Sequence, residues 1–321
     1  MISPPVKTIL VAAPYTAESL TRLKISLPEM IIEKCEPSCL VGERPDVAAL
    51  LIRSGTVVDA EILKQFPELK VVVTATSGFD HIDLGHCKEH RVQVGFVPMA
   101  NPESAAELTI WLILSVLRKA QMAAVAINKK QWRSSVSVGH ELAGKTLGIV
   151  GLGRIGSRVS ELAKAFYMHV VAYDPYVSES HFERLGVESC GLMELLRQAQ
   201  VVSLHVPLTD ETRELINRQT LAYFAADAVL INASRGRVVN ENDLIDALDE
   251  QRLAGAGLDV FVKEPLAPGS RLRDFPQVVM TPHIGAYTHE AQWRASDMAV
   301  DKIINFFQQG RSGWPEDETL C

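Results

Sequence analysis

Three side chains suited to acid–base chemistry and carboxylate binding follow short apolar runs in the second half of the chain. These are Arg235, Glu264 and His283. Ligands gather at the carboxyl ends of strands in open parallel sheets, so the three are expected to lie close together. An arginine fork can bind a carboxylate, and a histidine beside a carboxylate can exchange protons near neutral pH. Taken singly, each also has an ordinary explanation: a solvated charge, a first-turn carboxylate and a satisfied loop histidine.

A glycine-rich segment, Gly151-Leu-Gly-Arg-Ile-Gly156, lies between a strand-like run at 146–150 and an amphipathic stretch. Gly151 allows a tight turn, Gly153 allows close approach of a pyrophosphate, and Gly156 allows a helix to pack closely on a strand. The amino end of the following helix offers unpaired N–H groups to phosphates. This context predicts a dinucleotide site rather than a glycine turn without a ligand.

Asp174 ends the next strand-like run, 18 residues after Gly156. A carboxylate at this place binds the ribose hydroxyls of an adenosine and repels a 2′-phosphate. Pro175 and Tyr176 follow, so neither of the next two positions supplies a cation to offset that charge. The sequence therefore favours NAD over NADP.

The elements that must position these residues follow one rhythm in both halves. Short apolar runs alternate with helix-like stretches, which is typical of parallel strands joined by crossovers. The second half contains six such runs, which is the number of strands in a complete dinucleotide-binding fold. They begin near Thr146, Val170, Val201, Ala228, Ala254 and Val278. In the first half four occur, at 8–13, 48–53, 70–75 and 92–97, before a long helical pattern from 102 to 122 and a polar loop from 128 to 144. A last helical pattern covers 288–307.

Composition excludes several classes of protein. The chain has 321 residues, 47% of them hydrophobic and 22% charged, with a formal net charge of −7. Such a chain has ordinary globular usage, carries no bulk attraction to nucleic acid or anionic membranes, and at this length is expected to form two domains. Its longest apolar runs fall short of the roughly 18 residues of a membrane helix. Five scattered cysteines are expected to stay reduced in the cytoplasm.

His86 and His90 lie four residues apart on a predicted helix, a spacing that could hold a metal. A third ligand with suitable spacing is missing nearby, so the interpretation preferred for this chain is that it has no metal site. His205, at the end of the third strand of the second half, is expected to border the adenine or ribose.

The sequence resembles the D-isomer-specific 2-hydroxyacid dehydrogenases over nearly its whole length. The motifs that carry the resemblance, in chain order, are Ser77-Gly-Phe-Asp-His-Ile-Asp83, Glu107-Leu-Thr109, Leu142-Ala-Gly-Lys-Thr-Leu-Gly-Ile-Val150, the glycine-rich segment, Ala233-Ser-Arg-Gly236, Glu264-Pro-Leu266 and Thr281-Pro-His-Ile-Gly285. The resemblance implies an α/β protein of two doubly wound domains, in which a Rossmann NAD-binding domain at 104–287 is inserted into a flavodoxin-like substrate-binding domain at 1–103 plus 288–321. It also implies a cleft between the domains and a homodimer formed through the NAD-binding domain.

The resemblance assigns roles to particular residues. Arg235, Glu264 and His283 are implied to be catalytic. The cofactor-binding residues are implied to be Thr109, Gly151, Gly153, Arg154, Ile155, Gly156, Asp174, His205, Val206, Pro207, Ala233, Ser234, Asp259 and Gly285. The substrate-binding residues are implied to be Arg53, Ser54, Ser77, Gly78 and Arg133. Of these, Arg53 and Arg133 are the candidates to bind a substrate phosphate, and the alternative is that Arg53 ties down a loop and Arg133 belongs to an exposed basic stretch.

Within the family the chain looks most like the phosphoglycerate dehydrogenases that lack a regulatory domain, enzymes of serine biosynthesis. This likeness implies a small 2-hydroxy or 2-oxo acid as partner, 3-phosphoglycerate or phosphohydroxypyruvate, with no nucleic acid and no membrane. Thr74 departs from the pattern, because some relatives place a cation there, and this weakens the case for a phosphorylated substrate. Two alternatives stay open: a glyoxylate or hydroxypyruvate reductase, and an NAD-sensing scaffold like the corepressors that use this fold.

Overall fold

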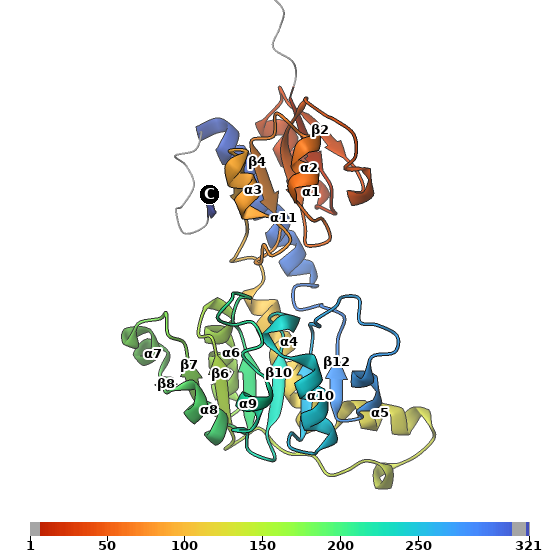
Figure 1. Ribbon diagram of the computed structural model, residues 1–321, viewed down its shortest axis with the longest axis vertical. Coiled ribbons are helices and arrows are strands. Elements are labelled where there is room, and N and C mark those ends of the chain that lie inside the picture. The colour runs from red at the N-terminus through yellow and green to blue at the C-terminus, as the bar shows by residue number, and fades with distance from the viewer. Residues whose placement is uncertain (1–6, 310–318, 321) are drawn as a thin grey trace, which may run out of the picture. The chain divides into compact units, whose positions relative to one another are not determined.

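The computed structural model describes residues 7–309 and 319–320, and in it the chain divides into two compact units (Figure 1). Unit 1 consists of Met1–Asn101 and Tyr287–Cys321, and unit 2 is the continuous segment Pro102–Ala286. The observed boundaries fall one or two residues before the expected ones at 103 and 287. Cys321 and the other terminal residues of the expected substrate-binding domain lie outside the described residues.

Unit 1 is built on a six-stranded sheet in the order β13-β5-β4-β3-β1-β2. Its strands are β1 (Thr8–Val11), β2 (Ile31–Lys34), β3 (Val47–Ile52), β4 (Val71–Thr74), β5 (Gln93–Gly95) and β13 (Thr319–Leu320). All neighbouring pairs are parallel except β13 with β5. Without β13 the order is that of the flavodoxin-like doubly wound fold, as the resemblance implies.

Helices cover both faces of this sheet. They are α1 (Ala17–Ser26), α2 (Ala60–Gln65), α3 (Leu84–Glu89) and α11 (His289–Gln309), with a short 3₁₀ turn η1 (Pro37–Cys39). Side chains of α1 and α11 pack on one face and those of α2 and α3 on the other. Thr16, Asp59 and Asp83 cap the amino ends of α1, α2 and α3 through their side-chain oxygens, so each helix begins where its cap stands.

The four strands predicted in the first half are present as β1, β3, β4 and β5. The prediction missed two further strands of this sheet, β2 in the first half and β13 near the end of the chain. β2 is an edge strand whose residues are exposed or half-buried, and Ile31 in it keeps 52% of its surface exposed. It therefore lacks the continuous apolar run that marked the buried strands. β13 has only two residues and comes from the far end of the chain.

Unit 2 is built on a seven-stranded parallel sheet in the order β12-β11-β10-β9-β6-β7-β8. Its strands are β6 (Thr146–Val150), β7 (His169–Tyr173), β8 (Glu188–Ser189), β9 (Val201–Leu204), β10 (Val229–Asn232), β11 (Gly255–Leu258) and β12 (Val278–Met280). In chain order this is 3-2-1-4-5-6 with a seventh strand added, which is the Rossmann topology. The strand order reverses between β6 and β9, so a crevice for a ligand is expected at their carboxyl ends.

Two layers of helices enclose the sheet of unit 2. The helices are α4 (Pro102–Leu117), α5 (Ala120–Asn128), α6 (Arg154–Ala165), α7 (Glu179–Leu185), α8 (Leu192–Gln198), α9 (Arg218–Leu221) and α10 (Glu241–Asp249), with 3₁₀ turns η2 (Arg133–Ser135), η3 (Gly236–Val238) and η4 (Arg271–Asp274). Side chains of α4, α6 and α7 form the core on one face, and those of α8, α9 and α10 form the core on the other.

Two expectations for this unit were wrong. The six predicted strands are seven, because β8 is a two-residue, fully exposed edge strand without an apolar run. The single helix predicted over 102–122 is broken after Leu117, where Lys119 takes a left-handed φ of +55°, and α5 then continues at 65° to α4. Within the described residues no single helix is long and apolar enough to span a membrane, and only the bent pair α4 and α5 passes that test together.

Candidate active site

The glycine-rich segment forms the connection from β6 to α6. Gly151 has a φ of +94°, and a Cβ there would lie 2.7 Å from the carbonyl oxygen of His205. At Gly156 a Cβ would overlap the carbonyl oxygen of Gly151, so only glycine lets α6 begin this close to the strand. A Cβ on Gly153 would meet open space, and Gly153 gives α6 no side-chain cap. The first-turn N–H groups of α6 are therefore left for an anion.

Asp174 follows β7 and is anchored to this segment. Its Oδ2 accepts a hydrogen bond from the backbone N–H of Leu152 at 2.8 Å, and its Oδ1 accepts one from the N–H of Tyr176 at 2.9 Å. Each oxygen keeps a further lone pair that a ribose hydroxyl can use. The carboxylate is thus held in a fixed orientation at the carboxyl ends of β6 and β7.

His205 follows β9, beside the crevice. Its backbone N–H donates to Val150, and its Nε2 lies 2.8 Å from the hydroxyl of Ser203. Burial lowers the pKa of His205 to about 4, so the ring is neutral at pH 7. Val206 packs onto the unit 2 core, and the carbonyl of Pro207 accepts from the Thr212 hydroxyl at 2.6 Å.

Arg235 stands in a turn that Asn232 builds at the end of β10. The Asn232 side chain accepts from the N–H of Ser234 at 3.1 Å and donates to the carbonyl of Arg235 at 2.9 Å. The next residue is Gly236, where a Cβ would overlap the backbone of Phe261. This contact places the turn of Arg235 against the loop that follows β11. Nη1 of Arg235 donates to the carbonyl of Ser234 at 2.8 Å.

His283 and Glu264 form a hydrogen-bonded pair across the loops that follow β12 and β11. The Nδ1–H of His283 donates to Oε2 of Glu264 at 2.7 Å, and Oε1 of Glu264 accepts from the N–H of Phe261 at 3.0 Å. The bond fixes the ring and leaves Nε2 as the nitrogen that can meet a ligand. The side chain of His283 is 46% exposed, so it can reach one.

The pKa values of this pair move in the directions that favour a charged pair. The hydrogen bond to Glu264, opposed by partial burial, raises the pKa of His283 above 6.5. Burial alone would raise the pKa of Glu264, but the bonds from His283 and the Phe261 N–H outweigh it and lower the pKa. The positive charge of Arg235 adds to the lowering of the Glu264 pKa and opposes the rise of the His283 pKa, so all three side chains interact electrostatically.

Asp259 holds the loop that carries His283. Its carboxylate accepts from the Thr281 hydroxyl at 2.6 Å and from the N–H groups of Ile284 at 2.8 Å and Gly285 at 2.9 Å. Its carbonyl accepts from the N–H of His283 at 2.8 Å, where the backbone takes a strained φ of +54°. The resemblance assigned Asp259 to the cofactor. In the structure this residue is only 1% exposed, and its hydrogen bonds go to the loop that carries His283.

The structure thus gathers most of the residues assigned to unit 2 at the carboxyl ends of its strands. The glycine-rich segment with Arg154 and Ile155, Asp174, the 205–207 loop and the turn at Ala233 and Ser234 follow β6, β7, β9 and β10. Thr109 is different: it is fully buried in α4, and its hydroxyl donates to the carbonyl of Ala105 at 2.8 Å. Thr109 therefore contributes to the packing of α4, and its buried side chain does not support cofactor binding. Arg133 lies exposed on η2.

In unit 1 the assigned substrate residues follow β3 and β4. Arg53 is held by three hydrogen bonds, from Nε to the Pro14 carbonyl at 3.0 Å and from Nη2 to the Ser296 hydroxyl at 3.2 Å and the Gln292 carbonyl at 3.4 Å. Its guanidinium also lies 5.5 Å from the centre of the Tyr15 ring. These contacts favour the alternative in which Arg53 ties down a loop, although Nη1 has no bond within the described residues.

The other unit 1 residues lie in exposed or half-buried turns. Ser54 is exposed in the turn after β3. Ser77 donates to Asn101, and the carbonyl of Gly78 accepts from the Thr76 hydroxyl at 2.6 Å. Thr74 stands where some relatives place a cation. It is buried, and its hydroxyl oxygen lies 3.0 Å from Nε2 of His81.

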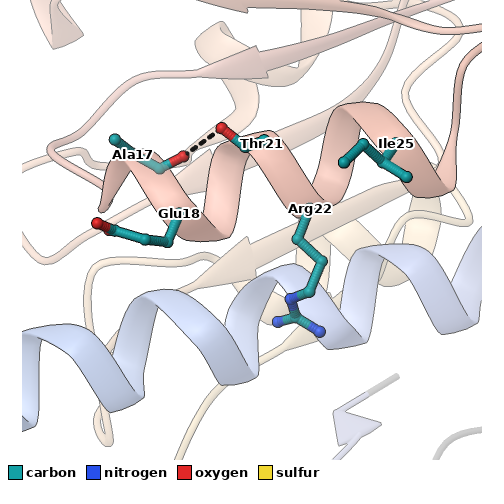
Figure 2. Close-up of a pocket in the computed structure, with 5 residues that line it drawn as sticks. All are labelled: Ala17, Glu18, Thr21, Arg22 and Ile25. Atoms are coloured by element: carbon teal, nitrogen blue, oxygen red, sulfur yellow. Dashed lines mark hydrogen bonds between the residues drawn. The ribbon is translucent and has the colours of Figure 1, made fainter.

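Two features outside this site are candidates for binding a ligand: the histidines of α3 and a hollow along α1. Among the described residues no group of three or more His, Cys, Asp or Glu side chains could hold a metal, and His86 is paired with Asp83 at 2.8 Å. An open hollow runs along α1, lined by Ala17, Glu18, Thr21, Arg22 and Ile25 (Figure 2). Arg22 points from it toward α11, where it binds Asp297 and Asp301, so its charge is already neutralised within unit 1.

Sequence reasoning missed the residues that position others. Asn232 and Gly236 shape the turn of Arg235. Asp259 was assigned to the cofactor, and its contacts with the His283 loop were not foreseen. A signal for Asn232 was present, because an asparagine two residues before a serine at a strand end is typical of an Asx turn. The clash that requires Gly236 depends on Phe261, in a loop more than twenty residues away, so it had no local signal.

Fold and site together define an α/β dinucleotide-binding protein with an Arg–Glu–His cluster beside the nucleotide crevice. The family model for the NAD-binding domain of the D-isomer specific 2-hydroxyacid dehydrogenases matches residues 110–285. The chain therefore belongs to this family, and unit 2 contains its NAD-binding domain. The Rossmann fold, the family and the NAD cofactor expected from the sequence are confirmed.

Curated relatives point to one branch of the family. The chain is 40% identical over 258 residues to the D-3-phosphoglycerate dehydrogenase of Bacillus subtilis, covering 80% of this chain and 49% of that protein. It is 42% identical over 264 residues to the D-3-phosphoglycerate dehydrogenase of Mycobacterium tuberculosis, covering 82% of this chain and 50% of that protein. The chain thus spans about half the length of the curated relatives it matches.

Solved structures extend the likeness over both units. A glyoxylate reductase from Paecilomyes thermophila superposes with a TM-score of 0.87 at 27% identity, covering 96% of this chain and 97% of that chain. A D-lactate dehydrogenase from Aquifex aeolicus, complexed with NAD and lactic acid, superposes with a TM-score of 0.82 at 29% identity, covering 96% and 97%.

Proposed function

We propose that this chain is an NAD-dependent dehydrogenase that oxidises D-2-hydroxy acids and reduces the corresponding 2-oxo acids. The observation that carries this proposal is the 2.7 Å hydrogen bond between His283 and Glu264. It holds a half-exposed imidazole with a raised pKa in the loop after β12, at the same carboxyl edge of the parallel sheet as Arg235 and the dinucleotide crevice.

In the proposed mechanism His283 is the proton carrier. Its Nε2 takes the proton of the substrate hydroxyl during oxidation and returns it to the carbonyl oxygen during reduction. Glu264 orients the ring and stabilises the imidazolium that results. Arg235 binds the substrate carboxylate through its rigid fork of donors. NAD held at this site would supply the hydride acceptor that the oxidation requires.

The residues present fit the cofactor. The open face of Gly153 and the uncapped start of α6 suit the pyrophosphate, and the anchored carboxylate of Asp174 suits the ribose. The proposed cofactor set further contains the remaining crevice residues, Gly151, Arg154, Ile155, Gly156, His205, Val206, Pro207, Ala233, Ser234 and Gly285. In this proposal Asp259 acts by holding the His283 loop.

The proposed substrate is 3-phosphoglycerate or phosphohydroxypyruvate, and with it a role in serine biosynthesis. Its support is that relatives 40–42% identical to this chain are D-3-phosphoglycerate dehydrogenases. Ser54, Ser77, Gly78 and the cations Arg53 and Arg133 are the proposed substrate-binding residues. Since Arg53 keeps only Nη1 available, Arg133 is the more important of the two for a phosphate in this proposal.

The proposed assembly is a homodimer formed through unit 2, in the cytoplasm. The surface that supports it comprises α5 and the segment after it, where Val125, Ile127, Trp132 and Val138 are 44%, 59%, 76% and 91% exposed. Apolar side chains gathered in this way are typical of an interface. Reduced thiols fit the proposed location, since the described cysteines Cys35, Cys39, Cys87 and Cys190 form no disulfide.

A panel of 2-oxo acids with NADH, followed by absorbance, tests the proposal. Phosphohydroxypyruvate should be reduced with a higher kcat/KM than hydroxypyruvate, glyoxylate, pyruvate or 2-oxoglutarate. Equal rates on glyoxylate and phosphohydroxypyruvate would favour a glyoxylate or hydroxypyruvate reductase. Binding of NADH without turnover of any acid would contradict the enzymatic proposal and favour a nucleotide-sensing scaffold.

A further inference from the structure

Tyr176 connects two loops at the carboxyl edge of the unit 2 sheet. Its backbone N–H donates to Oδ1 of Asp174 at 2.9 Å, just after β7. Its phenol hydroxyl donates to the carboxylate of Glu211, in the loop that follows β9. The side chain therefore reaches from the ribose-binding aspartate across to a second carboxylate, while its ring stays 77% exposed.

The loop that carries Glu211 is itself well ordered by hydrogen bonds. The Thr212 hydroxyl donates to the carbonyl of Pro207 at 2.6 Å and accepts from the N–H of Thr209 at 2.8 Å. Glu211 is thus fixed both by its own turn and by Tyr176. The hydrogen bond to Glu211 is the largest cause of the raised pKa of the Tyr176 hydroxyl, and the charge of Asp174 adds a smaller effect. Tyr176 therefore bonds to both carboxylates, to Asp174 through its backbone and to Glu211 through its side chain.

We propose that Glu211, oriented by Tyr176, is a second residue that excludes a 2′-phosphorylated dinucleotide from this site. The proposal rests on the NAD-binding function proposed above. A 2′-phosphate carries about 1.5 to 2 negative charges at pH 7 and would lie next to Asp174. Replacing Asp174 alone would leave the Glu211 carboxylate facing that phosphate. Arg184, on the neighbouring α7, donates to Nδ1 of His181 at 2.6 Å and is already engaged.

Calorimetric binding of ADP-ribose and 2′-phospho-ADP-ribose tests this proposal without any turnover. Glu211→Gln keeps an acceptor for Tyr176 and removes one charge. It should strengthen binding of the 2′-phosphorylated compound about 3- to 10-fold and change ADP-ribose binding by less than about twofold. Tyr176→Phe keeps the ring and releases Glu211, so it should give part of that gain. Asp174→Ala with Glu211→Gln should bind the phosphorylated compound more tightly than Asp174→Ala does.

Two controls separate a charge effect at this place from other causes. Glu194→Gln removes the same charge from the first turn of α8 and should leave both affinities as in the wild type. The gain in Glu211→Gln should shrink when the salt concentration is raised from about 0.05 to 0.5 M, because exposed charges are screened.

The possible results decide between the proposals. Equal affinities for the phosphorylated compound in Glu211→Gln and the wild type would overturn the role of Glu211, and so would a loss of both ligands to the same degree. If the wild type does not bind ADP-ribose at all, NAD binding itself is overturned, and the role of Glu211 with it.

Discussion

Nδ1 of His283 lies 2.7 Å from Oε2 of Glu264, and the histidine reaches this position with a left-handed backbone φ of +54°. A non-glycine residue in this region costs free energy, so surrounding contacts must hold it there. Asp259 supplies them through its carbonyl and its carboxylate. The ring that we propose as the proton carrier is therefore oriented by Glu264, and the loop that carries it is held by Asp259.

We expect the pH dependence of turnover to follow the raised pKa of His283. Oxidation requires the neutral ring, so kcat/KM for the hydroxy acid should rise with pH through an inflection above 6.5, the ordinary value. Reduction requires the protonated ring, so its kcat/KM should fall through the same inflection. Initial rates in both directions between about pH 5 and 9 measure this. An oxidation rate that is flat across this range would exclude His283 as the base.

Glu264→Gln should move that inflection to lower pH, because a neutral amide stabilises the imidazolium less than a carboxylate does. His283→Ala should lose about 10²- to 10⁴-fold in kcat, the usual contribution of general acid–base catalysis. An inflection that stays in place in a folded Glu264→Gln variant would remove Glu264 from its assigned role.

The same pair should make folding stability depend on pH. The contribution of His283 is present below 6.5 and is lost as the pH rises through its raised pKa. The contribution of Glu264 is present above 4.5 and is lost as the pH falls through its lowered pKa. The difference in Tm between the wild type and Glu264→Gln should therefore be largest between pH 4.5 and pH 6.5, where both contributions are present. A difference that does not vary with pH would contradict this.

Asp259→Asn should reduce both stability and turnover. The amide places a donor where the wild type accepts bonds from Thr281, Ile284 or Gly285, so at least one buried group loses its partner. An unpaired buried group costs about 1–3 kcal/mol of unfolding free energy. Urea denaturation and kcat measure the two effects. A variant with native stability and native kcat would show that the His283 loop is held by other contacts.

Gly153→Ala and Gly156→Ala form a matched pair with opposite expectations. A methyl group at Gly156 overlaps the Gly151 carbonyl and lies 3.2 Å from Ile149, so it should destabilise the protein by about 1–3 kcal/mol. A methyl group at Gly153 meets open space within the protein, so stability should be kept while NADH affinity falls. Thermal denaturation and NADH fluorescence titration distinguish the two. Tight NADH binding by Gly153→Ala would place the pyrophosphate elsewhere.

Asp174→Ala should weaken NADH binding about 10- to 150-fold, which corresponds to the loss of roughly 1.5–3 kcal/mol from a charged hydrogen bond. NADPH binding should weaken less, because the variant also removes a repulsion. Because Asp174 holds the N–H groups of Leu152 and Tyr176, its loss should also lower the Tm. If the wild type binds NADPH as tightly as NADH, Asp174 does not select the cofactor.

The sequence by itself determined the glycine-rich connection from β6 to α6 and the number of buried strands. The glycine-rich segment, Asp174 and the apolar runs are local signals, since turn geometry and strand burial depend on residues near in sequence. These signals were sufficient to place Arg235, Glu264 and His283 at strand ends. Exposed edge strands such as β2 and β8 had no such signal, because a strand with water on both faces needs no apolar run.

Tertiary structure alone decided how the site residues are held. The contact of Gly236 with the Phe261 backbone and the three bonds to the Asp259 carboxylate join loops from different strands, so spacing in the sequence does not reveal them. The bonds that occupy Arg53 also join residues that lie far apart in the sequence. Residue type fixes what a side chain can do, and its neighbours in space fix which donors and acceptors it has left to do it with.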